Sequence, residues 1–157
     1  MGSIRVVLAR IVFGLLRLGT WGHLWPPLSV AAVIECDDLI LLIDRSDGLG
    51  LCLPGGLVKW NETTRQALRR EVLEETGFHI AVVGCIGLYD DPDRDPRFRC
   101  IEIAYRATVL DGHPRPSAEG PLVWLPRSPL PAGLAFDHRL VLSEYLARHA
   151  TCFAMEG

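Results

Sequence analysis

Apolar runs bounded by turn residues predict strands before and after one central helix. Residues 28–36 and 39–44 are rich in aliphatic side chains and are separated by Asp37 and Asp38, which indicates a β-hairpin. A short strand is expected at 51–53, before a Pro-Gly-Gly turn. The same reasoning predicts strands at 80–88, 100–110 and 122–125, and a last helix over 136–149. Together these elements indicate an α/β layered domain.

The segment between the early and late strands carries the start and stop signals of a helix. Thr63 and Gln66 have the spacing of a capping box, in which each side chain bonds the backbone N–H of the other residue. Gly77 stands where a helix commonly ends on a glycine. We therefore expect a helix over residues 63–76.

Three glutamates lie on an unusual face of this predicted helix. Glu71, Glu74 and Glu75 are spaced i, i+3 and i+4, which places them within about a third of the circumference. The aliphatic residues of the helix share this arc, so that burying the helix would draw carboxylates inward. A hard divalent cation would compensate their charge, and Mg²⁺ is favoured when phosphates complete its shell. The alternative is a solvated helix whose glutamates pair with arginines four residues away.

The residues around these glutamates match a known motif, the Nudix box. Its pattern is a glycine, five residues, a glutamate, seven residues, and then R-E-U-x-E-E-x-G-U, where U is bulky and apolar. Gly56, Glu62 and the run 70–78 fill every fixed position at the right spacing. The chain therefore resembles the Nudix hydrolases. The resemblance implies an α/β/α sandwich with a mixed β-sheet, a loop-helix-loop box, and an ion pair between Glu62 and Arg70 that locks the box geometry.

The resemblance also implies a metal centre. Glu71, Glu74 and Glu75 would be ligands of Mg²⁺, for which Mn²⁺ could substitute. The backbone around Gly55 and Gly56 would add a carbonyl ligand, since glycines let the chain approach a ligand closely.

Pyrophosphate hydrolysis also needs a group that removes a proton from the attacking water. By resemblance, Glu71 is the first candidate for this base, and Glu75 is the other catalytic carboxylate of the box. Glu119, in a polar loop before the strand at 122–125, is the candidate for an additional catalytic carboxylate. Glu102 competes with Glu119, because strand alternation does not decide which face Glu102 occupies.

Two segments outside the box resemble the ADP-ribose pyrophosphatase branch of the family. One is the acidic, proline-containing loop 89–97, and the other is the stretch 134–138 before the last predicted helix. Arg94 and Arg97 are candidates to bind a terminal phosphate or ribose, although both could instead pair with neighbouring aspartates.

Three more residues are candidates for substrate binding. Trp60 and Tyr89 could stack on a base, although Trp60 could also be a core residue. Lys59 could reach a phosphate, and it stands where boxes of this type usually place an acidic residue. Alternatively, Lys59 marks a substrate preference that differs from that of the ADP-ribose pyrophosphatase branch.

The resemblance implies an Mg²⁺-dependent hydrolase that cleaves ADP-ribose to AMP and ribose 5-phosphate. Within the same class, nucleoside triphosphates and other nucleotide sugars are the alternatives. From other classes, the alternatives are a domain that senses ADP-ribose without turnover and a membrane-associated adaptor with a vestigial box. The intact glutamates argue against both.

Length, charge and cysteine content indicate the number of domains, the class of partner and the cellular compartment. The chain has 157 residues, which suits one domain. Its net charge of −3 includes no basic excess of the kind that binds nucleic acid, so we expect a small nucleotide as the partner. The five cysteines are odd in number and scattered, which predicts small buried hydrophobes in a reducing cytoplasm.

The N-terminal residues 1–27 form an extension before the predicted hydrolase domain of residues 28–157. Residues 4–18 are apolar except for Arg5, Arg10 and Arg17, and their uninterrupted stretches are too short to span a bilayer. We expect a helix there that packs on the domain or on a partner subunit in a homodimer, or one that rests on a membrane surface.

Overall fold

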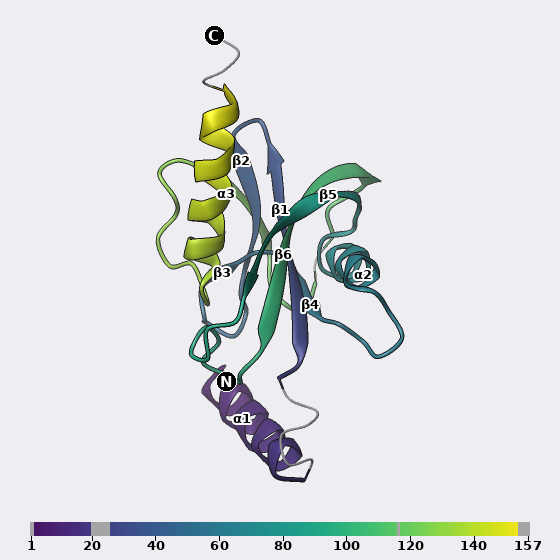
Figure 1. The fold of residues 1–157 in the computed structure, drawn as a ribbon, viewed down its shortest axis with the longest axis vertical. Helices are drawn as coiled ribbons and strands as arrows, with labels where there is room; N and C mark the ends of the chain where they lie inside the picture. Colours follow the sequence, from purple (N-terminus) through teal and green to yellow (C-terminus); the bar gives the residue numbers. More distant parts are fainter. Residues whose placement is uncertain (1, 20–25, 116, 154–157) are drawn as a thin grey trace.

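The computed structural model describes residues 2–19, 26–115 and 117–153. Within these ranges the chain forms three helices and a seven-stranded sheet (Figure 1). The elements in chain order are α1 (Gly2–Gly19), β1 (Leu28–Cys36), β2 (Leu39–Asp44), β3 (Leu51–Cys52), β4 (Gly55–Leu57), α2 (Thr64–Thr76), β5 (Phe78–Tyr89), β6 (Ile101–Gly112), β7 (Leu122–Pro126) and α3 (His138–Phe153).

The sheet is mixed, because one parallel pairing joins two antiparallel groups. The strand order is β3-β2-β1-β6-β5, with β4 paired to β1 and β7 paired to β2. β1 and β6 run parallel from Leu28↔Ile101 to Ile34↔Ala107, whereas β5 and β6 form a long antiparallel pair. This arrangement puts β1 at the centre of the sheet.

Side chains of β1 alternate between two hydrophobic cores, as the period of two residues in a strand requires. Val30, Ala32 and Ile34 join the cluster that includes α2. Ala31 and Val33 join the cluster that includes α3. The two helices therefore cover opposite faces of the sheet (Figure 1), which confirms the predicted sandwich of helix, mixed sheet and helix.

Most of the predicted elements are present. The hairpin of β1 and β2 is confirmed by antiparallel pairing at Cys36↔Leu39, with Asp37 and Asp38 in its turn at positive φ. The strands expected at 80–88 and 100–110 are each extended by the long β5–β6 pairing. The last helix begins at His138 and not at residue 136.

One strand was not expected. The Pro-Gly-Gly segment was predicted to be a turn, but Gly55–Leu57 forms β4 and pairs with β1 at Val30↔Gly56. Glycine is rare in strands because its backbone loses much freedom there. The close approach of the β1 backbone explains the choice, since a Cβ atom at Gly55 would lie 2.0 Å from the Val30 carbonyl oxygen.

The cysteines follow the prediction only in part. Cys52 and Cys100 are buried, as expected, whereas Cys36 and Cys85 are exposed, so the expectation of burial is wrong for these two. All four are free thiols. The side chain of Cys152 lies outside the described residues.

The N-terminal helix α1 projects from one end of the sheet (Figure 1). It contacts the domain through Phe13, whose ring centroid lies 4.2 Å from that of Phe98. Of the helices in the described ranges, none has both the length and the apolar content that crossing a membrane requires.

Candidate active site

Helix α2 begins and ends where its capping residues require. The Thr63 side chain accepts a hydrogen bond from Gln66 N, and the Gln66 side chain accepts one from Thr63 N, so the predicted capping box is present. Gly77 ends the helix in the left-handed conformation at φ 79°, and its N–H bonds Leu73 O at 3.0 Å. These caps satisfy backbone groups that a helix leaves open at both ends.

The buried face of α2 carries two of its glutamates into a pocket. Ala67, Leu68 and Val72 are fully buried against the sheet. Glu71 and Glu75, on neighbouring turns, line a pocket of about 380 Å³. The aliphatic face therefore fixes the direction of these two carboxylates.

Glu75 is the most deeply placed carboxylate of the box. Its Oε2 accepts a hydrogen bond from Gly55 N at 2.8 Å, which ties α2 to β4. Burial, together with the nearby charges of Glu119 and Glu71, raises the pKa of Glu75 to about 8, although the Gly55 N–H and Arg45 oppose the rise. The carboxylate form of Glu75 therefore lacks a compensating cation.

Glu71 packs against Gly56 of β4. A Cβ atom at Gly56 would lie only 2.7 Å from the Glu71 carboxyl carbon. A larger residue at Gly56 would therefore displace the Glu71 carboxylate. Glu71 Oε1 also accepts a hydrogen bond from Arg70 Nη1 at 2.6 Å, which holds its other side.

Arg70 and Glu62 connect α2 to the loop before it. Arg70 Nε donates to Glu62 Oε2 at 2.9 Å, and Arg70 Nη2 donates to Leu57 O at 3.1 Å. The bonds from Arg70 lower the pKa of Glu62 to about 2. The structure thus brings together the pair that the motif implies, in a geometry suited to holding the loop.

A second acidic group reaches the pocket from the loop before β7. Glu119 lines the pocket beside Glu71 and Glu75, with its side chain 47% exposed. Its Oε2 lies 3.6 Å from Arg45 Nη2. The charges of Glu119 and Glu75 are close enough to influence each other, so the pocket brings Glu71 and Glu75 of α2 together with Glu119 of the loop before β7.

Two arginines and an aromatic ring line the same pocket. Arg45 lies 5.3 Å and Arg97 4.8 Å from the centroid of the Phe136 ring. Arg97 is held by Asp95, which accepts hydrogen bonds from Arg97 Nε at 3.0 Å and Nη2 at 2.8 Å. Sequence reasoning missed Arg45 and Phe136, since neither belongs to the box.

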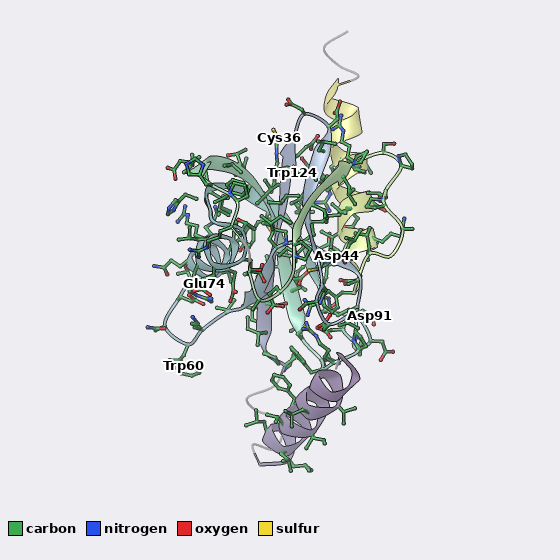
Figure 2. The ribbon with its side chains drawn as sticks, turned by 180° about the vertical axis from the view of Figure 1, so that it is seen from behind. Cys36, Asp44, Trp60, Glu74, Asp91 and Trp124 are labelled. Atoms are coloured by element: carbon green, nitrogen blue, oxygen red, sulfur yellow. The ribbon has the colours of Figure 1, made fainter. Side chains whose placement is uncertain are left out.

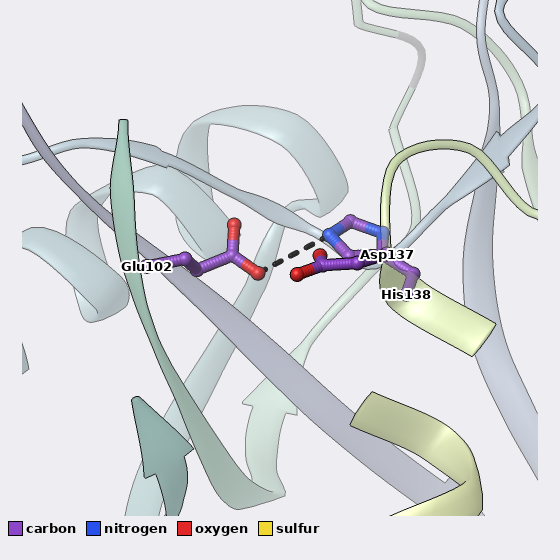
Figure 3. Close-up of side chains that lie close together, drawn as sticks. All are labelled: Glu102, Asp137 and His138. Carbon is purple, nitrogen blue, oxygen red and sulfur yellow. Dashed lines mark ion pairs between the residues drawn. The ribbon is translucent and has the colours of Figure 1, made fainter. Parts of the chain in front are cut away.

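Arg94 also lines the pocket, but its side chain is bound within a buried ion-pair network. Its Nη2 lies 2.8 Å from Glu102 Oε1 and 2.5 Å from Asp137 Oδ1, and its side chain is 2% exposed. His138 Nε2 lies 3.3 Å from the same Glu102 oxygen (Figure 3). Burial alone would raise the pKa of Glu102, but His138 and Arg94 together lower it.

This network carries its own cation. Glu102, Asp137 and His138 offer ligand atoms that all lie within 4.8 Å of one another, an arrangement that could hold a metal ion. The Arg94 guanidinium already bridges the two carboxylates, so a metal there would face a like charge. The network is therefore an ion-pair cluster that joins the loop of Arg94 to the start of α3.

His138 also holds the backbone just before β4. Its Nδ1 accepts a hydrogen bond from Leu53 N at 3.0 Å. Leu53 and Gly55 flank Pro54, so His138 holds one end of this short segment and Glu75 holds the other. The sequence signal for His138 was its place in the stretch 134–138, to which no role was attached.

The remaining candidates lie in other surroundings. Trp60 is 97% exposed on the loop before α2, so the alternative of a core residue is wrong, and Lys59 beside it is also exposed (Figure 2). Neither lines the pocket. Tyr89 is buried in the core on the α3 side and donates a hydrogen bond to Glu144 Oε2 at 3.0 Å. Glu74 points outward, with its side chain 54% exposed (Figure 2).

The pocket fits a hard divalent cation. Glu71, Glu75 and Glu119 converge there, and burial together with the charges of the other two raises the pKa of Glu75. Glu71, Glu75 and Glu119 could hold such an ion, with backbone oxygen from Gly55 or Gly56, since hard cations prefer oxygen ligands.

Comparisons with known proteins agree with this geometry. The NUDIX domain family model matches residues 25–145. An ADP-ribose pyrophosphatase of Methanocaldococcus jannaschii is 36% identical over 128 residues, which cover 79% of this chain and 75% of that protein. A crystal structure of an ADP-ribose pyrophosphatase from Streptococcus suis superposes with a TM-score of 0.64 at 26% identity, covering 79% of this chain and 93% of that chain. The MutT NUDIX hydrolase from Burkholderia pseudomallei gives 0.68 at 28% identity, covering 76% and 98%. The chain therefore belongs to the Nudix family of hydrolases, enzymes that act on pyrophosphate bonds.

Proposed function

We propose that the protein is an Mg²⁺-dependent pyrophosphatase that cleaves ADP-ribose to AMP and ribose 5-phosphate. The observation that carries the proposal is the composition of one pocket. Glu71, Glu75 and Glu119 meet there with Arg45, Arg97 and the Phe136 ring, and burial beside the other two carboxylates raises the pKa of Glu75. Carboxylates suit a metal, arginines suit phosphates, and an aromatic ring suits a base or a sugar face.

The carboxylates and the arginines of the pocket would have different roles in the reaction. Mg²⁺ held by Glu71, Glu75 and Glu119 would supply charge neutralisation for the diphosphate and activation of a water. Arg45 and Arg97 orient the phosphates, each being fixed by an aspartate.

Proton transfer completes the reaction. A water oxygen forms a bond to one phosphorus, and the bond from that phosphorus to the bridging oxygen breaks. Glu119 is the carboxylate placed to take the water's proton, because it is half exposed and lies on a loop at the pocket. Glu71 is the alternative base within the box, held at one oxygen by Arg70.

The choice of ADP-ribose rests on the relatives and on the loop of Arg94. The Methanocaldococcus jannaschii and Streptococcus suis proteins are ADP-ribose pyrophosphatases, and the first is similar over most of this chain. Arg94 and Arg97 both line the pocket, but the Arg94 side chain is 2% exposed and bound to Glu102 and Asp137, whereas the Arg97 side chain is 25% exposed. Arg97 is therefore the residue of the pair that contacts substrate. Lys59, Trp60 and Tyr89 remain predictions for substrate binding.

A substrate panel tests the proposal. The purified protein is incubated with Mg²⁺ or Mn²⁺ and with ADP-ribose, other nucleotide sugars or nucleoside triphosphates, and the release of AMP, ribose 5-phosphate or pyrophosphate is measured. We expect ADP-ribose to give the highest kcat/KM, and EDTA to abolish turnover. Faster hydrolysis of a triphosphate would replace the substrate assignment. Tight ADP-ribose binding without turnover under any divalent metal would favour the sensing domain.

Two further expectations accompany the proposal. The free thiols of Cys52 and Cys100 suit the reducing cytoplasm that the sequence predicts. A homodimer stays a prediction, and sedimentation of the full chain would measure it.

A further inference from the structure

The outer face of α1 is an exposed apolar surface that the hydrolase site leaves unexplained. Besides Leu16, which is 50% exposed, six aliphatic residues of this helix are each between 45% and 75% exposed: Val7, Leu8, Ile11, Val12, Leu15 and Leu18. Exposed aliphatic side chains that lie singly are common, whereas a contiguous group marks an interaction surface. We call these six residues the α1 outer face.

Helix geometry makes this face continuous. At about 100° per residue, the six residues fall within about 140° of the helix circumference. Phe13, which contacts Phe98, falls about 180° from the centre of that arc. The helix therefore contacts the domain on one side and presents the α1 outer face on the opposite side.

The charge of the helix indicates what would cover this face. Residues 2–19 contain three arginines, at positions 5, 10 and 17, and no acidic residue. An exposed apolar face on a helix whose only charged residues are cationic is the pattern of a helix that lies in the plane of an anionic bilayer surface.

A second copy of the chain fits this face less well. In a symmetric dimer the same helix meets itself, so its three positive charges would approach an equal charge on the other copy. No acidic residue in 2–19 would relieve that repulsion. Anionic lipid headgroups would pair with the same arginines while their acyl chains receive the aliphatic side chains.

We propose that α1 binds the protein to anionic membrane surfaces, with the α1 outer face inserted at the boundary of headgroups and acyl chains. Phe13 and Phe98 both line the candidate active-site pocket, so the bound protein would hold that pocket near the lipid surface.

Vesicle cosedimentation of the full chain tests this proposal. The probes are phosphatidylcholine vesicles and vesicles of equal parts phosphatidylcholine and phosphatidylglycerol. We expect at least about tenfold tighter binding to the anionic vesicles, and a loss of that difference in high salt. Ile11→Ser with Leu15→Ser should weaken binding by at least about tenfold, because two inserted aliphatic side chains are lost. Arg10→Gln with Arg17→Gln should weaken binding to the anionic vesicles alone.

A matched control removes two exposed aliphatics elsewhere. Val83 and Leu110, on β5 and β6, are 53% and 66% exposed, and their replacement by serine should leave vesicle binding unchanged. Equal binding to neutral vesicles, absence of binding, or equal loss in the control pair would each overturn the proposal. The proposal would also be overturned if the native chain formed a dimer without binding vesicles and that dimer dissociated in the Ile11→Ser, Leu15→Ser variant. Hydrolysis is measured separately, so that its absence bears only on the proposed function.

Discussion

Two acidic clusters of this protein use their carboxylates in opposite ways. Around Arg94, the carboxylates of Glu102 and Asp137 share one buried guanidinium, and the pKa of Glu102 is lowered. In the pocket, Glu75 shares its surroundings with other carboxylates, and its pKa is raised to about 8. Balanced charge joins elements of the fold, whereas unbalanced charge marks the place where a ligand supplies the missing cation.

The largest expected effect comes from unbalancing the first cluster. Arg94→Met leaves Glu102 and Asp137 buried without their cation, and we expect it to lower the free energy of unfolding by about 3–5 kcal/mol. Urea denaturation followed by circular dichroism measures the change. Arg148→Met, which breaks an exposed pair with Glu144, should cost at most about 1 kcal/mol.

A second substitution sharpens this prediction. Adding Glu102→Met to Arg94→Met should restore part of the lost stability, because it removes one of the stranded charges. A cost below about 1 kcal/mol for Arg94→Met alone would show that the network is not a structural ion pair.

A substitution in the second cluster, the carboxylates around Glu75, should lower activity without lowering stability. Glu75→Gln removes a charged metal ligand, and we expect kcat to fall about 10²–10³-fold while the melting temperature in EDTA does not decrease. Glu74→Gln is the matched control on the same helix, and because Glu74 points outward its effect should be smaller. Equal losses in the two variants would contradict the distinction between their positions.

The raised pKa of Glu75 also predicts how stability depends on pH. Between about 4.5 and 8, this carboxyl keeps its proton in the folded chain and loses it in the unfolded chain. The folded state then binds more protons, so stability falls as pH rises through this window, by up to about 5 kcal/mol. Urea titrations in EDTA at several pH values should show this slope in the native protein and a shallower one in Glu75→Gln. Saturating Mg²⁺ should reduce the slope in the native protein alone.

The smallest expected effect comes from a substitution that lowers stability without changing either acidic cluster. Thr63→Ala removes the N-cap of α2 and should cost about 1 kcal/mol of unfolding free energy. Because it touches neither cluster, kcat at a temperature well below melting should change less than about twofold. Thermal denaturation and the ADP-ribose assay measure the two quantities, and a large kcat loss would mean that the helix cap controls the pocket directly.

Local signals made much of this fold predictable. The capping box at Thr63, the glycine stop and the aspartate turn are each encoded within a few residues, and each appears where expected. The box spacing also places Glu71 and Glu75, since helical geometry fixes them once α2 packs.

Contacts between distant segments were not predictable in the same way. Arg94 looked available to a substrate, because nothing near it in sequence shows that Glu102 and Asp137 enclose it. Arg45 reaches the pocket only after β2 and the loop of Glu119 meet. Pairings across dozens of residues depend on tertiary packing, which single-sequence patterns do not report.

The hydrogen bond from Leu53 N to His138 fixes where the imidazole carries its proton. Because Nδ1 accepts from the backbone, a neutral ring has its hydrogen on Nε2, on the side that faces Glu102. One imidazole thus accepts from Leu53 N, two residues before Gly55, and faces the Arg94 network with its other nitrogen. His138 thereby joins the backbone just before β4 to the start of α3, while the Gly55 bond to Glu75 joins β4 itself to α2.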